Sequence, residues 1–165
     1  MVECVEVVIQ DRRWRQLDLK GLANSAGTAT LKHLEITPTP NAISLLGCDD
    51  PRIAALNQSF RNKAGATNVL SWPSAERSPG ATTGADLKIN DAPQEFGDIA
   101  ISYDTCAREA REMGKDMPAH VTHLIVHGIL HLLGYEHTGA QDAATMERLE
   151  TEILVSLGIE DPYRG

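Results

Sequence analysis

The sequence contains no apolar run close to the roughly 20 residues that a membrane-spanning helix needs, which argues against a helical membrane protein. Basic residues are in the minority, because 15 Lys and Arg stand against 23 Asp and Glu, for a formal net charge of −8. A surface of that charge repels polyanions, so general nucleic-acid binding is disfavoured and any contact with RNA requires a local basic cleft. We expect neither a membrane nor DNA as a partner.

Cysteine is also scarce. Cys4, Cys48 and Cys106 are odd in number and far apart, which predicts reduced thiols in small core positions, neither disulfides nor metal ligands. The first six residues, Met-Val-Glu-Cys-Val-Glu, show no basic region and no cleavage-site pattern of a secretory signal. We therefore expect a cytoplasmic protein.

The histidines of the sequence are concentrated in one segment. Five of its six histidines lie between His120 and His137, with Leu, Ile and Val between them. A helix over 118–133 would gather His120, His123, His127 and His131 in an arc of roughly 80° and leave much of the remaining surface apolar. This pattern predicts a buried helix with a stripe of imidazole rings.

The spacing of three histidines predicts a metal centre. His127 and His131 are one helical turn apart, Gly134 can adopt a left-handed conformation that turns the chain back, and His137 then supplies a third nitrogen. Three imidazoles with one open position are typical of catalytic zinc, whereas a structural site usually has a fourth protein ligand. His123, one turn earlier, is expected beside the metal ligands or along a groove, and His120 as a core histidine.

The pattern H-x-x-x-H-x-x-G-x-x-H has the ligand spacing of the metzincin proteases. Those enzymes carry a glutamate directly after the first histidine as the general base, and this chain has Gly128 there. Peptide hydrolysis by the usual route therefore loses its base. We hypothesise that the bare backbone at Gly128 lets a bulky phosphodiester approach the metal.

The remaining chain predicts one α+β domain over residues 1–165. Asp49-Asp50-Pro51 is a strong helix start, with Ile53, Leu56 and Phe60 expected to face inward. Residues 74–95 hold Pro, Gly, Ala, Thr and Asp with little periodicity and predict a surface loop. The expected strands are 4–10, 42–48, 68–72 and 97–102. The expected helices are 11–22, 28–34, 51–62, 104–113, 118–133 and a last one that ends before Gly158. A break at Gly27 is expected to separate the first two helices.

A basic cluster, Arg12-Arg13-Trp14-Arg15, lies near the N-terminus. It is interpreted as a solvated first helical turn anchored by one aromatic side chain, with RNA contact as the alternative.

In its motifs and in their order along the sequence, the chain resembles the YbeY family of bacterial metal-dependent endoribonucleases. The strongest motif is His127-Gly-Ile-Leu-His-Leu-Leu-Gly-Tyr-Glu-His137, which matches H-G-x-L-H-L-x-G-Y-D-H except at Glu136. Leu56-Asn57…Arg61 is followed by Thr67-Asn-Val-Leu-Ser-Trp-Pro73, where the family usually has T-D-V-L-S-F-P. The third motif is Gly97-Asp-Ile-Ala-Ile-Ser102.

The resemblance implies a single α+β domain with a mixed four-stranded sheet beside a metal-binding helix that ends in a glycine turn, as in zincins. It implies that His127, His131 and His137 bind a divalent metal, usually zinc, and that the family's functional arginine is Arg61. It also implies processing of ribosomal RNA, notably at the 3′ end of the small-subunit RNA, and ribosome quality control. The implied partners are ribosomal RNA, the small ribosomal subunit and assembly factors.

We therefore expect metal-dependent cleavage of phosphodiester bonds in single-stranded RNA, with Arg61 paired to a phosphate and Lys63 and Arg52 as additions to a basic cleft. Asn68 stands where the family usually has aspartate, so the resemblance implies no role for a carboxylate at this position of the chain. Two alternatives stay open: a ribosome-assembly module with a structural metal, and a metallohydrolase of another substrate class. Whether water or a ribose 2′-hydroxyl attacks is open as well.

Overall fold

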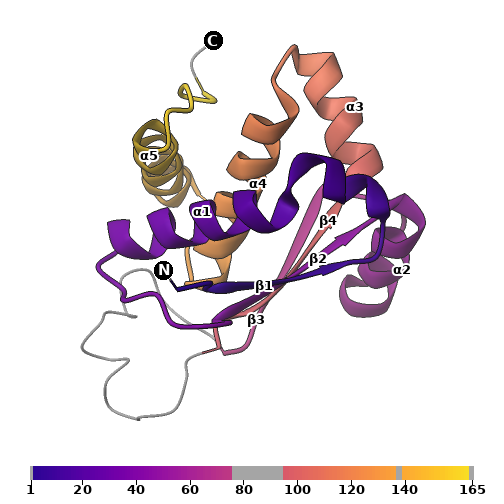
Figure 1. Cartoon of the computed structure of the whole chain (residues 1–165), viewed down its shortest axis with the longest axis horizontal. Helices are drawn as coiled ribbons and strands as arrows, with labels where there is room; N and C mark the ends of the chain where they lie inside the picture. The colour runs from indigo at the N-terminus through magenta and orange to yellow at the C-terminus, as the bar shows by residue number, and fades with distance from the viewer. Residues whose placement is uncertain (1, 76–94, 137–138, 164–165) are drawn as a thin grey trace.

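The protein is described here by a computed structural model covering residues 2–75, 95–136 and 139–163 (Figure 1). The predicted loop over 74–95 lies, apart from its ends, outside these residues. The strands are β1 (Val5–Ile9), β2 (Ile43–Cys48), β3 (Val69–Pro73) and β4 (Gly97–Ser102). The helices are η1 (Arg12–Leu17, a 3₁₀ helix), α1 (Leu19–His33), α2 (Asp50–Arg61), α3 (Tyr103–Met113), α4 (Met117–Leu132) and α5 (Ala140–Ser156).

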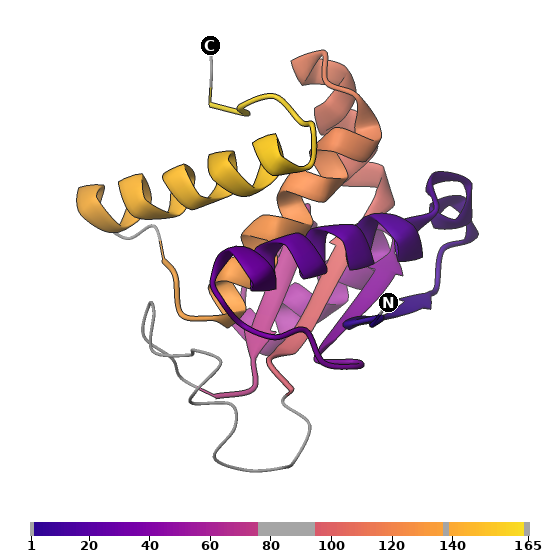
Figure 2. The ribbon, with the colours of Figure 1, turned by 60° about the vertical axis from the view of Figure 1, so that its left-hand side comes forward.

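The four strands form one mixed sheet in the order β1-β2-β4-β3, which confirms the predicted α+β fold. β1 pairs parallel with β2, β2 parallel with β4, and β3 antiparallel with β4, with Val69 opposite Ile101. Helices α1 and α4 cover one face, and α2 lies on the other (Figures 1 and 2). Strand β3 is therefore an edge strand beside the histidine helix, so any site between α4 and β3 opens to solvent.

The core fills both sides of the sheet. The main cluster joins α1, α4 and α5 to the sheet, and a smaller one, with Cys48, Ile53, Leu70 and Ala100, lies under α2. All three cysteines are buried and free, as predicted, and burial raises the pKa of the Cys48 thiol to about 12. A thiol that stays protonated packs as a small apolar group and does not bind metal.

The predicted helix break at Gly27 is wrong. The break falls at Asp18, which separates η1 from α1 with left-handed angles (φ 51°, ψ 58°), and α1 then runs without interruption to His33. Gly27 lies where α1 approaches β1, and an added Cβ would stand 2.8 Å from both Cys4 Sγ and Val5 Cγ2. The glycine therefore serves close helix–strand packing, an interaction that helix propensity alone does not reveal.

Helix α2 begins as predicted, because Asp49 caps it by accepting from the Arg52 backbone N–H at 3.0 Å. The Asp50 carboxylate then accepts from the Ser102 and Thr105 hydroxyls, both at 2.6 Å, which ties the start of α2 to the end of β4 and the first turn of α3. The prediction that Phe60 faces inward is wrong, since 66% of it is exposed. Its ring lies edge-on to Trp72 of β3 at 5.6 Å, so it covers the sheet edge instead of filling the core.

The basic cluster near the N-terminus is partly neutralised. Trp14 is buried, and its indole N–H donates to the Cys48 carbonyl at 3.0 Å. Arg13 pairs with Asp11 and, at 2.8 Å, with Asp104 of α3, and its guanidinium stacks on Tyr103 at 4.5 Å. The anchored-turn interpretation thus accounts for both residues, because Trp14 holds η1 to the end of β2 and Arg13 holds it to α3.

Arg13→Ala is expected to lower the free energy of unfolding by about 1 kcal/mol at neutral pH, a small loss because the side chain is 42% exposed and solvent screens the pairs. Hydrogen bonds from Arg13 hold the pKa of both Asp11 and Asp104 below the usual range. Carboxylates with a lowered pKa stabilise the fold above their unfolded-state pKa, and that contribution is lost as pH falls through the folded-state value. Urea unfolding should therefore show a smaller difference between parent and variant near pH 3 than at pH 7. Arg15→Ala, on the same turn, is the control, and an unchanged difference at pH 3 would contradict the electrostatic origin.

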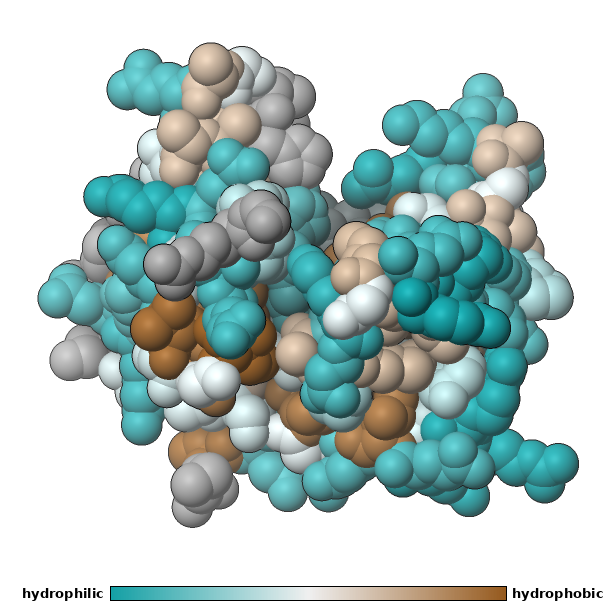
Figure 3. Space-filling model, turned by 90° about the horizontal axis from the view of Figure 1, so that it is seen from above, coloured by the Kyte–Doolittle hydropathy of each residue, from teal (hydrophilic) through white to brown (hydrophobic). Residues whose placement is uncertain are grey.

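The surface is mainly hydrophilic on the face shown in Figure 3, with hydrophobic residues in a few separate patches. Within the described part of the chain, no helix has both the length and the apolar character needed to cross a membrane.

Candidate metal centre and RNA-binding pocket

Helix α4 presents the histidines as predicted. It runs from Met117 to Leu132, with Pro118 in its first turn, and most of its residues are buried. Gly134 has a φ of 97°, and the Tyr135 backbone N–H donates to the Leu130 carbonyl at 3.0 Å, so the predicted glycine turn closes the helix. The turn places Glu136 beside His131, with Glu136 Oε2 3.4 Å from His131 Nδ1.

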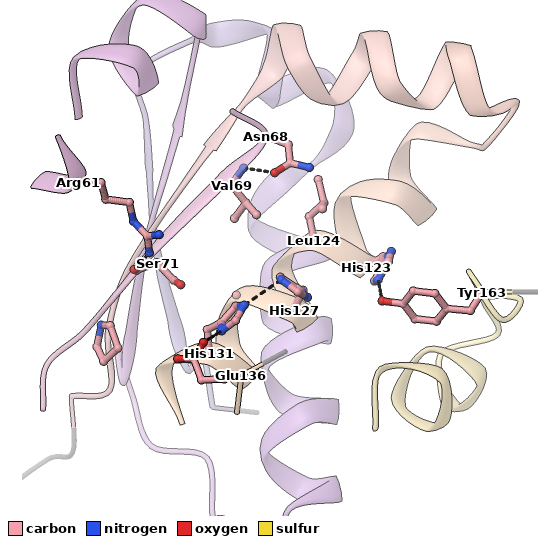
Figure 4. A pocket seen from close by; sticks show the side chains of 12 residues that line it. Arg61, Asn68, Val69, Ser71, His123, Leu124, His127, His131, Glu136 and Tyr163 are labelled. Carbon is pink, nitrogen blue, oxygen red and sulfur yellow. Dashed lines mark hydrogen bonds and ion pairs between the residues drawn. The ribbon is translucent and has the colours of Figure 1, made fainter. Parts of the chain in front are cut away.

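His127 and His131 converge. Both rings line one pocket; their Nε2 atoms are 3.0 Å apart, and the ring planes are nearly perpendicular, at 83° (Figure 4). Each ring also has a carboxylate behind it, since His127 Nδ1 lies 3.1 Å from Glu150 Oε1 and His131 Nδ1 lies 3.4 Å from Glu136 Oε2. A carboxylate behind Nδ1 favours the tautomer with the proton on Nδ1, which leaves a lone pair on Nε2.

Glu150 is a buried charge. It comes from α5, is 1% exposed, and its Oε1 also lies 2.8 Å from His123 Nε2. Burial by itself raises the pKa of Glu150, but the hydrogen bonds from His123 and His127 outweigh it and lower the pKa to about 2. The side chain therefore stays ionised at neutral pH and accepts from both rings.

These residues fit a metal ion. The two Nε2 atoms lie close enough to share one cation, because two nitrogens bound to one tetrahedral zinc ion lie about 3.3 Å apart. A histidine ligand that donates its other N–H to a carboxylate is the usual second-sphere arrangement. The third predicted ligand, His137, lies outside the described residues. Among those that are described, no three His, Cys, Asp or Glu side chains gather as a metal site, so the three-histidine set stays a prediction.

Arg61 lies on the opposite wall of the same pocket, which has a volume of about 450 Å³ (Figure 4). It is the last residue of α2, and its Nη2 donates to the Ser71 carbonyl of the edge strand β3 at 3.2 Å. Asn57, one turn earlier, is buried and donates to the Gly65 carbonyl at 3.1 Å, which fixes the loop after α2. The structure thus brings Arg61 to the histidine pocket from the other side of the sheet.

Asn68, the departure from the usual family motif, also lines this pocket. Its side-chain amide donates to Glu109 at 3.0 Å, and its carbonyl oxygen accepts from the Val69 backbone N–H at 2.7 Å. The other partner of Glu109 is the buried His120, at 3.0 Å from Nε2, as expected for a core histidine. An amide at position 68 suits this site, because an aspartate there would face the Glu109 carboxylate.

Gly128 borders the pocket, but its missing side chain would point elsewhere. A Cβ added there would lie 3.2 Å from Ile99 Cδ1 in β4, where α4 crosses the sheet. The structure therefore supplies a packing reason for the glycine in addition to the hypothesis of phosphodiester approach.

Gly128→Ala is expected to change the free energy of unfolding by less than about 1 kcal/mol, because higher helix propensity offsets crowding at Ile99. On the packing explanation its RNA cleavage should match the parent, whereas the approach hypothesis predicts slower cleavage. Gly128→Leu, which cannot fit against Ile99, should lose several kcal/mol. Cleavage rates and urea unfolding of both variants decide between the two. Slow cleavage by a stable Gly128→Ala protein would contradict the packing explanation.

Three residues of this site were not found from the sequence: Glu109, Glu150 and Tyr163. Glu150 carried a weak signal, since Met146, Glu150 and Leu154 follow each other at four-residue spacing, which places a carboxylate on the buried stripe of α5. Tyr163 follows α5, and its hydroxyl donates to Glu150 Oε2 at 2.9 Å. Nothing in its sequence context indicates this contact.

Comparisons with known proteins agree with the architecture. The family model described as Endoribonuclease YbeY matches residues 6–158. Endoribonuclease YbeY of Jannaschia sp. strain CCS1 is 52% identical over 159 residues, covering 96% of this chain and 99% of the relative. The protein of the same name from Cereibacter sphaeroides is 50% identical over 167 residues, covering 99% of this chain and all of the relative. The solution structure of TM1509 from Thermotoga maritima shares the fold, with a TM-score of 0.57 at 20% identity over 98% of this chain and 99% of that one.

Proposed function

This chain belongs to the YbeY endoribonuclease family, and on that premise we propose that it is a metal-dependent endoribonuclease that cleaves single-stranded ribosomal RNA. One observation supports this most: a single pocket holds the paired Nε2 atoms of His127 and His131 on one wall and Arg61 on the facing wall. We further propose the 3′ end of the small-subunit RNA as substrate, a role in ribosome quality control, and the cytoplasm as location. The small ribosomal subunit and its assembly factors are the proposed partners.

The proposed metal ligands are His127, His131 and His137. Imidazole ligands with an open position suit zinc. Once bound, zinc would supply Lewis acidity and a water molecule of lowered pKa, which reduces the need for a carboxylate base at position 128. Glu150 and Glu136 would hold the two rings so that both Nε2 atoms face the pocket.

Arg61 would bind the phosphate. A guanidinium has several N–H donors in one plane, and the bond to the Ser71 carbonyl fixes the orientation of that plane. Because the protein carries a net charge of −8, a fixed cation at the pocket is needed to draw a phosphodiester to it. The same charge would stabilise the negative charge that develops during cleavage.

The proposal is tested by incubating the purified chain with a small-subunit 3′-end RNA, with a DNA of the same sequence, and with the RNA annealed to its complement. We expect cleavage of the single-stranded RNA alone, loss of cleavage on chelation, recovery with zinc, and discrete mapped termini. Circular dichroism of the stripped protein separates the alternatives, because neither histidine of the pair is among the buried residues that form the hydrophobic core. Unfolding on chelation would instead favour a structural metal in an RNA-binding module.

A further inference from the structure

Glu150 is the most unusual residue of α5. Its neighbours on the buried face of the helix are apolar, namely Met146, Leu149, Ile153 and Leu154, whereas Glu147 and Glu152 of the same helix are exposed. Burying a carboxylate costs several kcal/mol unless hydrogen bonds compensate. An apolar side chain would have filled the position at no such cost, so the carboxylate requires a reason.

The contacts of Glu150 supply that reason. Its Oε1 accepts from two rings of α4, His123 at 2.8 Å and His127 at 3.1 Å. Its Oε2 accepts from the Tyr163 hydroxyl at 2.9 Å. The carboxylate thus joins α5, α4 and the segment after α5 at one point, directly behind the ring that faces the pocket.

Tyr163 completes the arrangement. Its ring stands edge-on to His123 at 5.7 Å and borders the pocket. Burial, together with the neighbouring Glu150 charge, raises the pKa of Tyr163, so its hydroxyl remains a donor at neutral pH. With Oε2 engaged by Tyr163, the other oxygen is held toward the two histidines.

We infer that Glu150 is a positioning residue that fixes the His127 ring with its proton on Nδ1 and its Nε2 toward the pocket, and that Tyr163 orients the Glu150 carboxylate for this purpose. This inference deepens the proposed function, since it rests on His127 as a metal ligand. It assigns to α5 and the segment after it a share in metal affinity, although neither supplies one of the two converging Nε2 atoms.

The experiment compares three variants of the full-length chain: Glu150→Gln, Tyr163→Phe and the control Glu147→Gln. The control removes the same charge from an exposed position one turn before Glu150. Two properties are measured: zinc affinity, by competition with a chromophoric chelator, and the His127 tautomer, by ¹⁵N chemical shifts of the ring. Thermal unfolding identifies any variant that fails to fold.

Glu150→Gln should bind zinc about 10- to 100-fold more weakly than the parent, as is usual when a second-sphere carboxylate is lost, and its His127 should lose the preference for Nδ1–H. Tyr163→Phe keeps the carboxylate and should weaken binding by a smaller factor, while Glu147→Gln should match the parent. If Glu150→Gln does not fold, Tyr163→Phe carries the test, because Tyr163 is 45% exposed.

Parental zinc affinity and an unchanged His127 tautomer in both Glu150→Gln and Tyr163→Phe would overturn the inference. A parent chain that binds zinc but does not cleave RNA would overturn the proposed function and leave the inference intact. If the parent takes up no zinc, the proposed function fails, and the tautomer comparison alone decides the role of Glu150.

Discussion

His131→Ala is expected to abolish both zinc binding and RNA cleavage while the protein stays folded. The His131 side chain is 17% exposed at the pocket and supplies one of the two converging Nε2 atoms. Metal catalysis is worth several kcal/mol of transition-state stabilisation, and each 1.36 kcal/mol is tenfold in rate, so cleavage should fall by at least about a thousandfold. The metal-free variant should be about as stable as the metal-free parent, because His131 is only partly buried at the pocket wall and is not part of the hydrophobic core.

His33→Ala provides the matched control. His33 lies at the end of α1 and pairs with the exposed Glu152 at 2.8 Å, so the change removes an imidazole without touching the pocket. The measurements are zinc content, cleavage rate and thermal unfolding with and without chelator. Parental cleavage by His131→Ala would exclude the proposed centre.

Arg61→Ala is expected to reduce cleavage by about 100- to 1000-fold, the cost usually seen when one group that stabilises developing charge is removed. Zinc affinity should not change, because Arg61 lies on the wall opposite the histidines (Figure 4). Stability should change by less than about 1 kcal/mol, since Arg61 is exposed and, within the described part of the chain, its side chain donates to the Ser71 carbonyl alone.

Two further variants make the Arg61 test specific. Arg52, which the sequence suggests as an addition to the basic cleft, is exposed near the start of the same helix and is not among the described residues that line the pocket. Arg52→Ala should therefore cleave RNA at a rate close to that of the parent. Arg61→Lys keeps the charge but loses the planar fork, so it should recover only part of the activity. An Arg61→Ala protein that loses stability in proportion to activity would mean that Arg61 is structural.

The histidine helix and its glycine turn were predictable because their physics is local. Spacing along one helix determines which histidines share a face, and a glycine after the last apolar pair indicates where the helix ends. The four strands were also predictable, since each is a short apolar run bounded by turn residues. For the same reason the Asp49 cap of α2 was found from sequence alone.

The parts that were missed depend on contacts between distant segments. Gly27 looks like a helix breaker, and only the packing of α1 on β1 explains it. Phe60 has helical spacing for the core, but its ring lies edge-on to Trp72 of the edge strand β3 and stays exposed. Glu150 and Tyr163 reach the histidines only because α5 folds back along α4, and nothing local predicts that contact.

Arg61 was only partly predictable from the sequence. Its position on α2 was predictable, but from spacing alone it is an ordinary exposed helix arginine. Its role came from the family resemblance. The structure now adds a geometric argument, because Arg61, at the end of α2, bonds to Ser71 of the edge strand β3 and lines the same pocket as His127 and His131.

The central claim is that a metal held by the α4 histidines is responsible for cleavage. The most direct test titrates the metal-stripped chain with zinc while bound metal and the rate of RNA cleavage are measured in the same samples. We predict a rate that rises in proportion to occupancy and saturates at about one zinc ion per chain, as expected for a single three-histidine centre. Cleavage that persists at full rate in the stripped protein, or does not appear when the site is filled, would contradict the claim.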